Sequence, residues 1–358
     1  MFDIAIVGAG MAGASLAAEL APHARVLLLE AEAAPGYHAT GRSAAFWTES
    51  YGGPGVQPLT TASGPWLRER GFLTPRGALT IAREEGRARL ESFAESFATL
   101  GVRIERLDRA ALGMRISGLR SEWVLGALEP DCCDIDVAAL HQHYLAAARK
   151  AGTQLWCAAR LARAEHGTGA WSLTMEDGRS ARAALLVDAA GAWADAVAQL
   201  AGARKLGFQA YRRTIAQLRT APAAPVDLPL VLDLDEQFYF KPDAGRVWLS
   251  PHDETLSVPC DAAPDELDVA TAIDRFEQVV DWRIERLEHR WAGLRTFAPD
   301  RLPVYGFDPA VPGFFWFAGQ GGFGIQTAPA AAQLAAAQLL GRTPGTVDPA
   351  PFQATRFY

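Results

Sequence analysis

The sequence is poor in cysteine, in histidine and in long hydrophobic runs, and each shortage excludes a class of protein or site. Its 358 residues include only four cysteines, Cys132, Cys133, Cys157 and Cys260, and none of them belongs to a CxxC pair. Adjacent cysteines such as the first two rarely bridge, so the sequence indicates neither a disulfide framework nor a zinc site. The seven histidines are scattered and add no metal-binding pattern. No metal is therefore expected.

Positive charge and membrane-spanning segments are also missing. The formal net charge is −7 and no run of basic residues occurs, so a nucleic-acid partner is not expected. No stretch reaches the roughly 18 consecutive apolar residues that a transmembrane helix needs. Met1-Phe2-Asp3 leads directly into the first predicted strand, which leaves no room for a signal peptide. These observations predict a cytoplasmic protein.

The first thirty residues carry the strongest pattern in the chain. An apolar run from Asp3 to Val7 is followed by the glycine-rich sequence Gly8-Ala9-Gly10-Met11-Ala12-Gly13 and by an alanine-rich segment that reaches Ala21. A second apolar run, Val26 to Leu29, ends at Glu30, 22 positions after Gly8. This order predicts a strand, a tight turn, a helix, a parallel strand and an acidic residue, which together form the dinucleotide-binding fingerprint.

Each residue of this fingerprint has a physical role. Gly8 permits the turn, Gly10 lets a pyrophosphate approach the backbone, and Gly13 lets the helix pack closely on the strand. The pyrophosphate would lie at the helix N-terminus, where free N–H groups and the helix dipole favour an anion. Glu30 is placed to accept hydrogen bonds from a ribose diol, which argues against a 2′-phosphate and therefore against NADP. The fingerprint alone leaves FAD and NAD open.

Three later stretches are predicted to return to the same cofactor. Thr40 to Ala45 combines small residues with a predicted helix start. Asp188 to Trp193 joins a predicted strand to a new helix through a turn of small residues. Gly319 to Gly324 follows a buried strand and precedes a predicted helix over 326–340. The positive N-terminal end of that helix would stabilise negative charge on a reduced flavin, which favours FAD over NAD.

These motifs occur in an order that resembles the D-amino-acid oxidase (DAO) superfamily of FAD enzymes, and most closely its bacterial D-arginine dehydrogenases, which are D-amino-acid dehydrogenases of broad specificity. The resemblance covers nearly the whole chain. It is carried by the N-terminal fingerprint and by the segments Thr40-Gly41-Arg42-Ser43-Ala44-Ala45, Cys133-Asp134-Ile135-Asp136, Val187-Asp188-Ala189-Ala190-Gly191-Ala192-Trp193, Trp291-Ala292-Gly293-Leu294-Arg295 and Gln320-Gly321-Gly322-Phe323-Gly324-Ile325-Gln326. The turns at 42–45 and 319–324 lack the cysteine or histidine that attaches flavin in covalent members, so FAD is expected to be non-covalent.

The resemblance implies which residues contact FAD. They come from the turns named above, from the ribose acid and its neighbour, from a strand that packs on the adenine, and from the substrate side of the flavin: Gly8, Gly10, Met11, Ala12, Gly13, Glu30, Ala31, Gly41, Arg42, Ser43, Ala44, Ala45, Leu161, Ala190, Gly191, Trp193, Arg295, Gly321, Gly322, Phe323, Gly324 and Ile325.

A flavin that oxidises an amino acid needs a cation to hold the substrate carboxylate, so that Cα–H points at flavin N5. Arg295 is the best candidate for this clamp, because a guanidinium matches a carboxylate in a bidentate fashion. No catalytic acid–base residue is predicted, since none is required if the amine enters neutral and hydride leaves Cα directly. By resemblance, the other substrate-side residues are Tyr239, Arg212, Tyr51, Phe46, Gly322 and Gln326, with Arg213 as eligible as Arg212 for a second cationic role.

Two departures from the resembled dehydrogenases bear on the side chain of the substrate. Phe46 stands where those enzymes have a histidine near the substrate. Gly77 and Ala78 offer no carboxylate where those enzymes hold a cationic side chain, although Glu84 or Glu85 could substitute. These differences predict a preference for apolar or aromatic D-amino acids over D-arginine.

The predicted activity is FAD-dependent oxidative deamination of D-amino acids. A hydride passes from Cα to flavin N5, and the imino acid hydrolyses to a 2-oxo acid and ammonia. The alternatives are a glycine or N-methyl-amino-acid (sarcosine-type) oxidase and a flavin-binding subunit of a heteromeric amine dehydrogenase. The electron acceptor is oxygen or a quinone, and a quinone would add peripheral membrane association.

The predicted fold class is α/β: a Rossmann-like FAD-binding domain of the glutathione-reductase type, interleaved with an α+β substrate domain built on a mainly antiparallel sheet. A hydrophobic content of 49% is ordinary for a soluble globular protein, and the length allows two intertwined domains. Residues 1–75, 135–207 and 300–358 are assigned to the FAD-binding domain, and residues 76–134 and 208–299 to the substrate domain.

Hydrophobic periodicity predicts several further elements. A helix is expected over 65–71. A single strand is expected over 155–164. A long amphipathic helix is expected over 268–287, followed by a strand over 288–294 that ends at Arg295.

Overall fold

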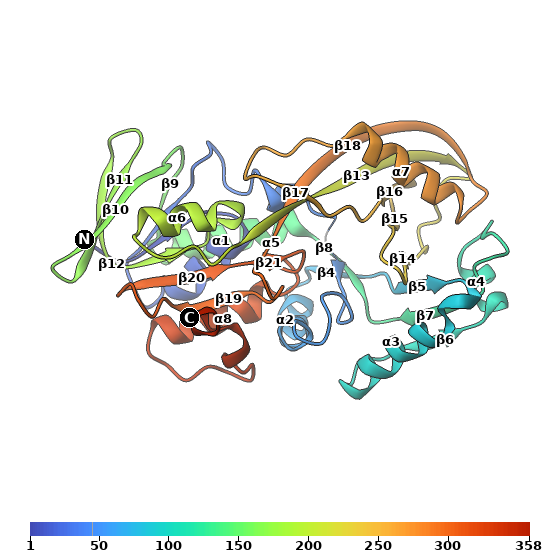
Figure 1. Cartoon of the computed structure of the whole chain (residues 1–358), viewed down its shortest axis with the longest axis horizontal. Coiled ribbons are helices and arrows are strands. Elements are labelled where there is room, and N and C mark those ends of the chain that lie inside the picture. The colour runs from blue at the N-terminus through green and yellow to red at the C-terminus, as the bar shows by residue number, and fades with distance from the viewer. Residues whose placement is uncertain (45) are drawn as a thin grey trace.

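Two β-sheets, joined by long strands, form the frame of the protein in a computed structural model that describes residues 1–44 and 46–358. The predicted cofactor contact of Ala45 lies outside the described residues. Both chain ends lie beside the first sheet, and the long strands β13 (Gln209–Ala221) and β18 (Arg283–Phe297) extend from the centre of the molecule to its far end (Figure 1). The fold class is α/β, as predicted.

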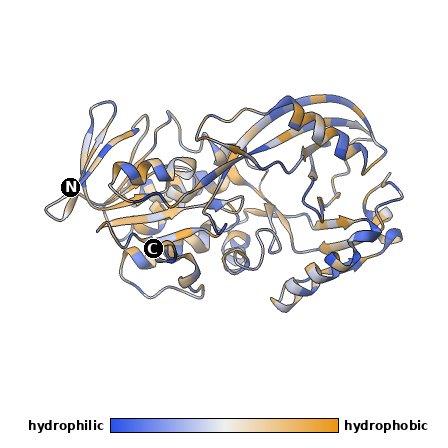
Figure 2. Ribbon diagram, in the orientation of Figure 1, coloured by the Kyte–Doolittle hydropathy of each residue, from blue (hydrophilic) through white to orange (hydrophobic). Residues whose placement is uncertain are grey.

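The first sheet is built around β1 (Phe2–Val7), the strand of the fingerprint. It pairs in parallel with β2 (Val26–Leu29) on one side and with β12 (Ser180–Asp188) on the other. Strand β20 (Phe314–Ala318) pairs in parallel with β12 and is buried throughout, in keeping with its hydrophobic colour in Figure 2. The remaining strands of this sheet are β9 (Gln154–Trp156), β10 (Leu161–Gly167), β11 (Ala170–Met175) and β19 (Val304–Phe307).

The single strand expected over 155–164 is wrong. The chain pairs with β2 as β9, turns at Ala158, whose φ is 47°, and re-enters the sheet at its opposite edge as β10. The apolar pattern continues across the turn because both pieces are partly buried, so periodicity alone could not show the break. The predicted hairpin partners β11 and β12 pair antiparallel.

Alternation along β1 gives the sheet two covered faces. Ile4 and Ile6 point into the cluster that contains α1 (Met11–Leu20) and two further helices. Ala5 and Val7 point into the opposite cluster, which includes α6 (Ala194–Leu200). The two further helices on the α1 side are α5 (Val137–Lys150) and α8 (Ala328–Leu339).

The second sheet is mainly antiparallel and lies beside the first (Figure 1). Its order is β21-β18-β13-β16-β15-β14-β5-β7-β6, with β17 paired to β13. Besides β13 and β18, its strands are β5 (Ala78–Ala82), β6 (Glu105–Leu107), β7 (Leu125–Glu129), β14 (Leu230–Asp233), β15 (Tyr239–Asp243), β16 (Arg246–Ser250), β17 (Thr255–Ser257) and β21 (Gln320–Gly321).

The long helix expected over 268–287 is correct only in its first part. Helix α7 spans Glu266–Glu277 and is capped by Asp265, whose side chain accepts from Leu267 N at 2.9 Å. Val279 and Val280 continue the apolar pattern, but they are buried in the core of the second sheet as the chain turns into β18. Arg295 therefore lies within a strand of 15 residues and not at the end of a short one.

A small third sheet links the two larger ones. It consists of β3 (Phe46–Trp47), β8 (Cys133–Ile135) and β4 (Leu73–Pro75). Helix α2 (Gln57–Glu69) begins earlier than the helix expected over 65–71, because Pro58 and not Pro65 occupies the first turn. Helices α3 (Arg87–Thr99) and α4 (Arg109–Arg115) flank β6 and β7.

The two larger sheets alternate along the chain, and the assignment of particular ranges to a cofactor domain and a substrate domain stays a prediction. Within residues 1–44 and 46–358, no helix has both the length and the apolar character needed to cross a bilayer. The same residues contain no cluster of three histidine, cysteine or acidic side chains arranged to hold a metal ion.

Candidate active site

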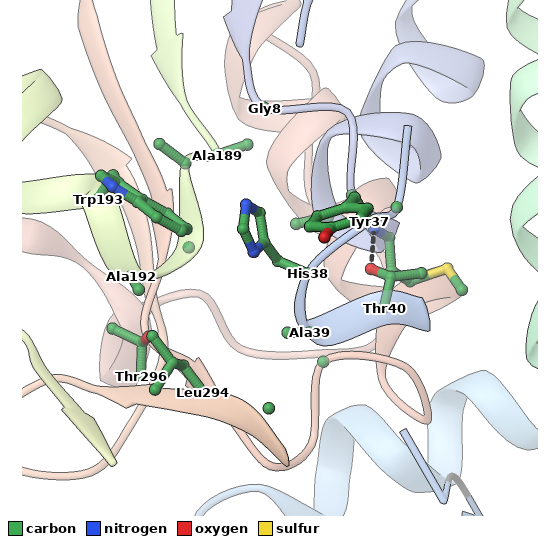
Figure 3. A pocket seen from close by; sticks show the side chains of 18 of the residues that line it. Gly8, Tyr37, His38, Ala39, Thr40, Ala189, Ala192, Trp193, Leu294 and Thr296 are labelled. Carbon is green, nitrogen blue, oxygen red and sulfur yellow. Dashed lines mark hydrogen bonds between the residues drawn. The ribbon is translucent and has the colours of Figure 1, made fainter. Parts of the chain in front are cut away.

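A cavity of about 420 Å³ lies between the two larger sheets. Its walls come from the β1–α1 turn, the end of β2, the segment η1 (Ala39–Arg42), the end of β12 and the strands β18 and β21. Figure 3 shows Gly8 and Ala189 at one side of this space and Leu294 and Thr296 of β18 at another. The volume is within the range of small-molecule and cofactor sites.

The β1–α1 turn is tight because its glycines leave no room for a side chain. Gly8 has φ +102°, and a Cβ there would overlap the carbonyl oxygen of Ala189. A Cβ on Gly13 would overlap the carbonyl oxygen of Gly8. The first N–H of α1, on Met11, donates to Thr40 Oγ1 at 2.9 Å, which brings η1 to the helix N-terminus (Figure 3). The turn therefore lines the cavity at the N-terminus of α1, which is where the sequence predicts a pyrophosphate.

Glu30 is a buried acid at the end of β2 and lines the cavity. Its carboxylate accepts from Ala9 N at 3.1 Å and from Glu32 N at 2.9 Å. These two bonds hold the carboxylate beside the glycine turn. Its position is the one predicted for a ribose acid.

The η1 side of the cavity adds two aromatic rings that the sequence did not single out, those of Tyr37 and His38. The ring of His38 lies 4.7 Å from the ring of Trp193 and 5.0 Å from that of Tyr37, and Figure 3 shows His38 between the other two. Arg42 extends to the second sheet and donates to the carbonyl oxygens of Ala262 at 2.8 Å and Ala292 at 3.2 Å. Arg42 therefore ties the cofactor side of the cavity to β18.

Arg295 occupies the other end of the cavity together with two tyrosines. Its Nη1 donates to Tyr51 Oη at 2.7 Å, and its Nη2 lies 3.5 Å from Tyr239 Oη. A Cβ on Gly322 would lie 2.6 Å from Tyr51 Oη and 3.3 Å from Arg295 Cζ, so the glycine allows this close packing. Among the described residues, no carboxylate lies within ion-pair distance of Arg295. Its positive charge is thus available to an anion from solution.

Arg213 lines the cavity together with Arg295, whereas Arg212 does not line it. Arg213 is 4% exposed, lines the cavity and donates from Nε to Asp253 O at 2.8 Å. Its Nη1 is buried without a hydrogen-bond partner in the described part of the chain, and burial, together with the positive charge of Arg295, lowers its pKa. Arg212 points the other way and pairs with Asp268 at 2.7 Å. This corrects the substrate-side prediction for Arg212, because neighbouring residues of a strand face opposite sides.

His252 stands behind this end of the cavity. Its Nδ1 lies 2.7 Å from the carbonyl oxygen of Glu236. Its ring packs edge-to-face with that of Tyr239, with the ring centroids 5.7 Å apart. Burial, followed by the positive charges of Arg213 and Arg295, lowers its pKa to about 2. The imidazole is therefore neutral at ordinary pH.

Most of the predicted site residues line the cavity. They are Gly8, Gly10, Met11, Ala12, Glu30, Ala31, Arg42, Ser43, Ala44, Leu161, Ala190, Gly191, Trp193, Tyr239, Arg295, Gly321, Gly322, Gly324 and Ile325. Tyr51 contacts the cavity through its hydrogen bond with Arg295. The ring centroid of Phe46 lies 5.3 Å from that of Tyr51 and 6.1 Å from that of Tyr239.

Four further predicted residues lie behind the lining. Gly13 packs under the turn, and Gly41 packs against Gly36. Phe323 contacts the ring of Tyr51 at 5.3 Å. Gln326 is 2% exposed and bonds to the segment that carries Tyr51, so it supports the lining and does not face the cavity. Sequence reasoning missed Tyr37 and His38 as lining residues, although both lie just before the Thr40–Ala45 motif, and it left Arg213 open as the alternative to Arg212.

The chain belongs to the family of FAD-dependent oxidoreductases described as DAO, whose model matches residues 3–338. Its fold is that of glycine oxidase from Geobacillus kaustophilus, with a TM-score of 0.86, 23% identity and coverage of 99% of this chain and 98% of the other. L-proline dehydrogenase from P. horikoshii has a similar fold, with a TM-score of 0.84, 18% identity and coverage of 99% of this chain and 98% of the other. At these identities the likeness concerns the fold.

A mouse protein, FAD-dependent oxidoreductase domain-containing protein 1, is 27% identical over 192 residues. The match spans 49% of this chain and 39% of the mouse protein. The chain therefore corresponds to less than half the length of that relative.

The residues of the cavity fit the FAD that the family requires. Gly8 and Gly13 close the turn under the N-terminus of α1, whose N–H groups suit a pyrophosphate. Glu30 suits a ribose, and Trp193 and His38 provide flat surfaces nearby. The predicted DAO family and the cofactor FAD are confirmed, whereas the closer resemblance to D-arginine dehydrogenases stays a prediction.

Proposed function

We propose that this protein is an FAD-dependent enzyme that oxidises the amine-bearing carbon of an amino acid. The observation that carries the proposal is Arg295, a cation in the cavity. It donates hydrogen bonds to tyrosine hydroxyls and has no carboxylate partner among the described residues. A substrate carboxylate would complete this arrangement. Bound FAD would supply the electron acceptor, taking a hydride from Cα at N5.

The chain's own residues would bind and orient the substrate. Arg295 would hold the carboxylate in a bidentate fashion, and the unpartnered Nη1 of Arg213 would donate a further hydrogen bond from the same side. The hydroxyls of Tyr51 and Tyr239 would fix the carboxylate in its plane. No side chain is assigned to proton transfer, because a neutral amine needs none.

For the substrate side chain we propose an apolar or aromatic group on a D-amino acid. The support is Phe46, which packs against the rings of Tyr51 and Tyr239 beside Arg295 and places an apolar ring near this end of the cavity. A kcat/KM for D-arginine well above those for D-leucine and D-phenylalanine would contradict this preference. The same arrangement would also admit glycine or an N-methyl amino acid, which keeps a sarcosine-type oxidase as the second candidate.

The proposal is tested by its products. Incubation with D-leucine or D-phenylalanine and an artificial electron acceptor should yield equal amounts of 2-oxo acid and ammonia. The L-enantiomers and sarcosine serve as comparison substrates, and turnover of those alone would redirect the proposal to the other handedness or to the second candidate. No product from any of them would favour a flavin-binding subunit of a larger amine dehydrogenase.

We propose non-covalent FAD, with oxygen or a quinone as the acceptor. Acid precipitation should release the yellow chromophore into the supernatant. Colour kept in the pellet would contradict non-covalent binding and would direct attention to His38 and Cys260, which line the cavity.

A further inference from the structure

Glu129 is a buried acid that accepts hydrogen bonds from one short segment of the chain. It ends β7 and is 2% exposed. Its Oε2 accepts from Thr48 Oγ1 at 2.6 Å, from Ser50 Oγ at 2.6 Å and from Ser50 N at 3.3 Å. Its Oε1 accepts from Glu49 N at 2.6 Å. One carboxylate thus fixes three consecutive residues, which immediately precede Tyr51.

No cation offsets the charge of this carboxylate. Within residues 1–44 and 46–358, no lysine, arginine or histidine forms an ion pair with Glu129. Burial raises its pKa, whereas the donors on Ser50, Thr48 and Glu49 oppose that rise. All four of its bonds are accepted and none is donated. The N–H groups of Glu49 and Ser50 can only donate to the carboxyl group, whereas the hydroxyls of Thr48 and Ser50 can also accept from it if it is protonated.

The same segment is held from its other side by Gln326. Thr48 N donates to Gln326 Oε1 at 3.3 Å, and Gln326 Nε2 donates to Tyr51 O at 3.2 Å. Beyond Tyr51 the chain turns at Gly52 and Gly53, whose φ angles are +98° and +77°. Thr48–Tyr51 is thus a clamped segment followed by a pair of glycines with left-handed backbone.

The clamped segment leads directly to Tyr51, whose hydroxyl accepts from the cavity residue Arg295 at 2.7 Å. We infer that Glu129 is a positioning residue for substrate recognition, acting through Thr48–Ser50 to hold Tyr51 against Arg295. The inference rests on the proposed function, because it takes Arg295 to be the group that binds the substrate carboxylate. Glu129 itself does not touch the substrate.

A double-mutant cycle tests the inference, because two residues that act through one contact have non-additive effects. In the holoenzyme, Glu129→Gln should raise the dissociation constant for a carboxylate ligand roughly 10-fold, since an amide has a single acceptor oxygen and cannot accept all four of these bonds. The limiting rate of flavin reduction should change by less than about threefold. Tyr51→Phe should also weaken binding, and adding Glu129→Gln to it should weaken binding no further. Multiplied effects in the double variant would overturn the inference.

Benzoate is the ligand for this cycle, titrated against the flavin absorbance. It carries a carboxylate but no oxidisable amine, so its binding reports on Arg295 and Tyr51 independently of turnover. If the wild-type protein binds benzoate but no amino acid reduces its flavin, the proposed function fails and the cycle still decides the role of Glu129. If the wild-type protein does not bind benzoate, Arg295 is not a carboxylate site and the inference fails with it.

Asp308 provides a matched control. It is also a buried carboxylate with four donors, from Ala310 N, Val311 N, Trp316 Nε1 and Tyr358 Oη, but it lies in the β19–β20 turn. Asp308→Asn should lower the melting temperature without changing the benzoate dissociation constant, and an equal loss of binding in both variants would overturn the inference. If Glu129→Gln does not fold, Ser50→Ala gives the same comparison through one lost hydroxyl. Its effect should be smaller and should again vanish beside Tyr51→Phe.

Discussion

Arg213 and Arg295 reach one cavity from neighbouring antiparallel strands. In the register of β13 and β18, Arg295 lies opposite Tyr211 and Arg213 lies opposite Gly293, so the two arginines are offset by two positions along the pair. Both line the cavity, and the charge of Arg295 contributes to the lowered pKa of Arg213. Arg213 Nη2 lies 3.5 Å from Glu254 Oε1, whereas Arg295 has no carboxylate partner within ion-pair distance among the described residues. The free charge of Arg295 in particular favours an anionic ligand.

Replacement of Arg295 should impair substrate binding far more than replacement of Arg212. Arg295→Lys should lower kcat/KM for the best amino acid roughly 100-fold, or about 3 kcal/mol, because the bidentate fork is lost. Arg212→Gln is the control from the opposite face of β13 and should stay within about threefold of wild type. Steady-state kinetics measure both, and equal losses would contradict the assignment of the clamp.

Substitution of Gly13 should remove the cofactor. Gly13→Ala places a methyl group on the carbonyl oxygen of Gly8, so the turn must open or α1 must shift. We expect purified protein with little bound flavin and a reduced melting temperature. Gly345→Ala, where a Cβ has no neighbour within 4 Å, is the control. A full flavin-to-protein absorbance ratio in Gly13→Ala would show that the turn tolerates the side chain.

Loss of the acid at the end of β2 should weaken FAD binding without unfolding the protein. Glu30→Ala removes the acceptor for Ala9 N and for a ribose hydroxyl. The dissociation constant for FAD should rise roughly 10- to 100-fold, the range of one or two hydrogen bonds to a charged group. Titration of apoprotein with FAD, followed by fluorescence quenching, provides the measurement. Unchanged affinity would remove Glu30 from the cofactor site.

His252 should make the protein less stable in acid. Its folded-state pKa of about 2 lies far below the ordinary 6.5. Between these two pH values the unfolded chain therefore binds a proton at this residue and the folded protein does not. Stability should therefore be full above pH 6.5 and fall as pH decreases, by roughly 2 kcal/mol at pH 5 from this group.

Urea unfolding at pH 7 and pH 5 tests this dependence. His252→Asn is the suitable variant, because asparagine tolerates the left-handed backbone at φ 55°. The free energy of unfolding of the variant should fall less between the two pH values than that of the wild type. The same fall in both proteins would assign the acid sensitivity to other groups.

The nucleotide-binding half of the fold was largely predictable from local sequence. The β1–α1–β2 fingerprint, the β11–β12 hairpin and the β20–turn–α8 unit are confirmed, because each has its own glycine signals and hydrophobic period. The family and FAD are confirmed as well. The side-chain preference, the handedness of the substrate and the individual site roles stay predictions.

What the sequence could not supply depends on register and on distant contacts. Arg212 and Arg213 are equivalent in sequence, and only the pairing of β13 decides which one faces the cavity. Glu129 reaches Thr48 across 81 positions, so no local pattern connects them. The end of α7 was misjudged because Val279 and Val280 are buried whether the chain is helical or extended.

Anaerobic mixing of the FAD-loaded protein with amino acids tests the central claim most directly. D-leucine or D-phenylalanine should bleach the flavin absorbance at roughly 450 nm, because reduced flavin loses that absorbance. The same mixing with Arg295→Lys should need a much higher substrate concentration. A flavin that stays oxidised with every D- and L-amino acid, glycine and sarcosine, while dithionite bleaches it, would contradict the account.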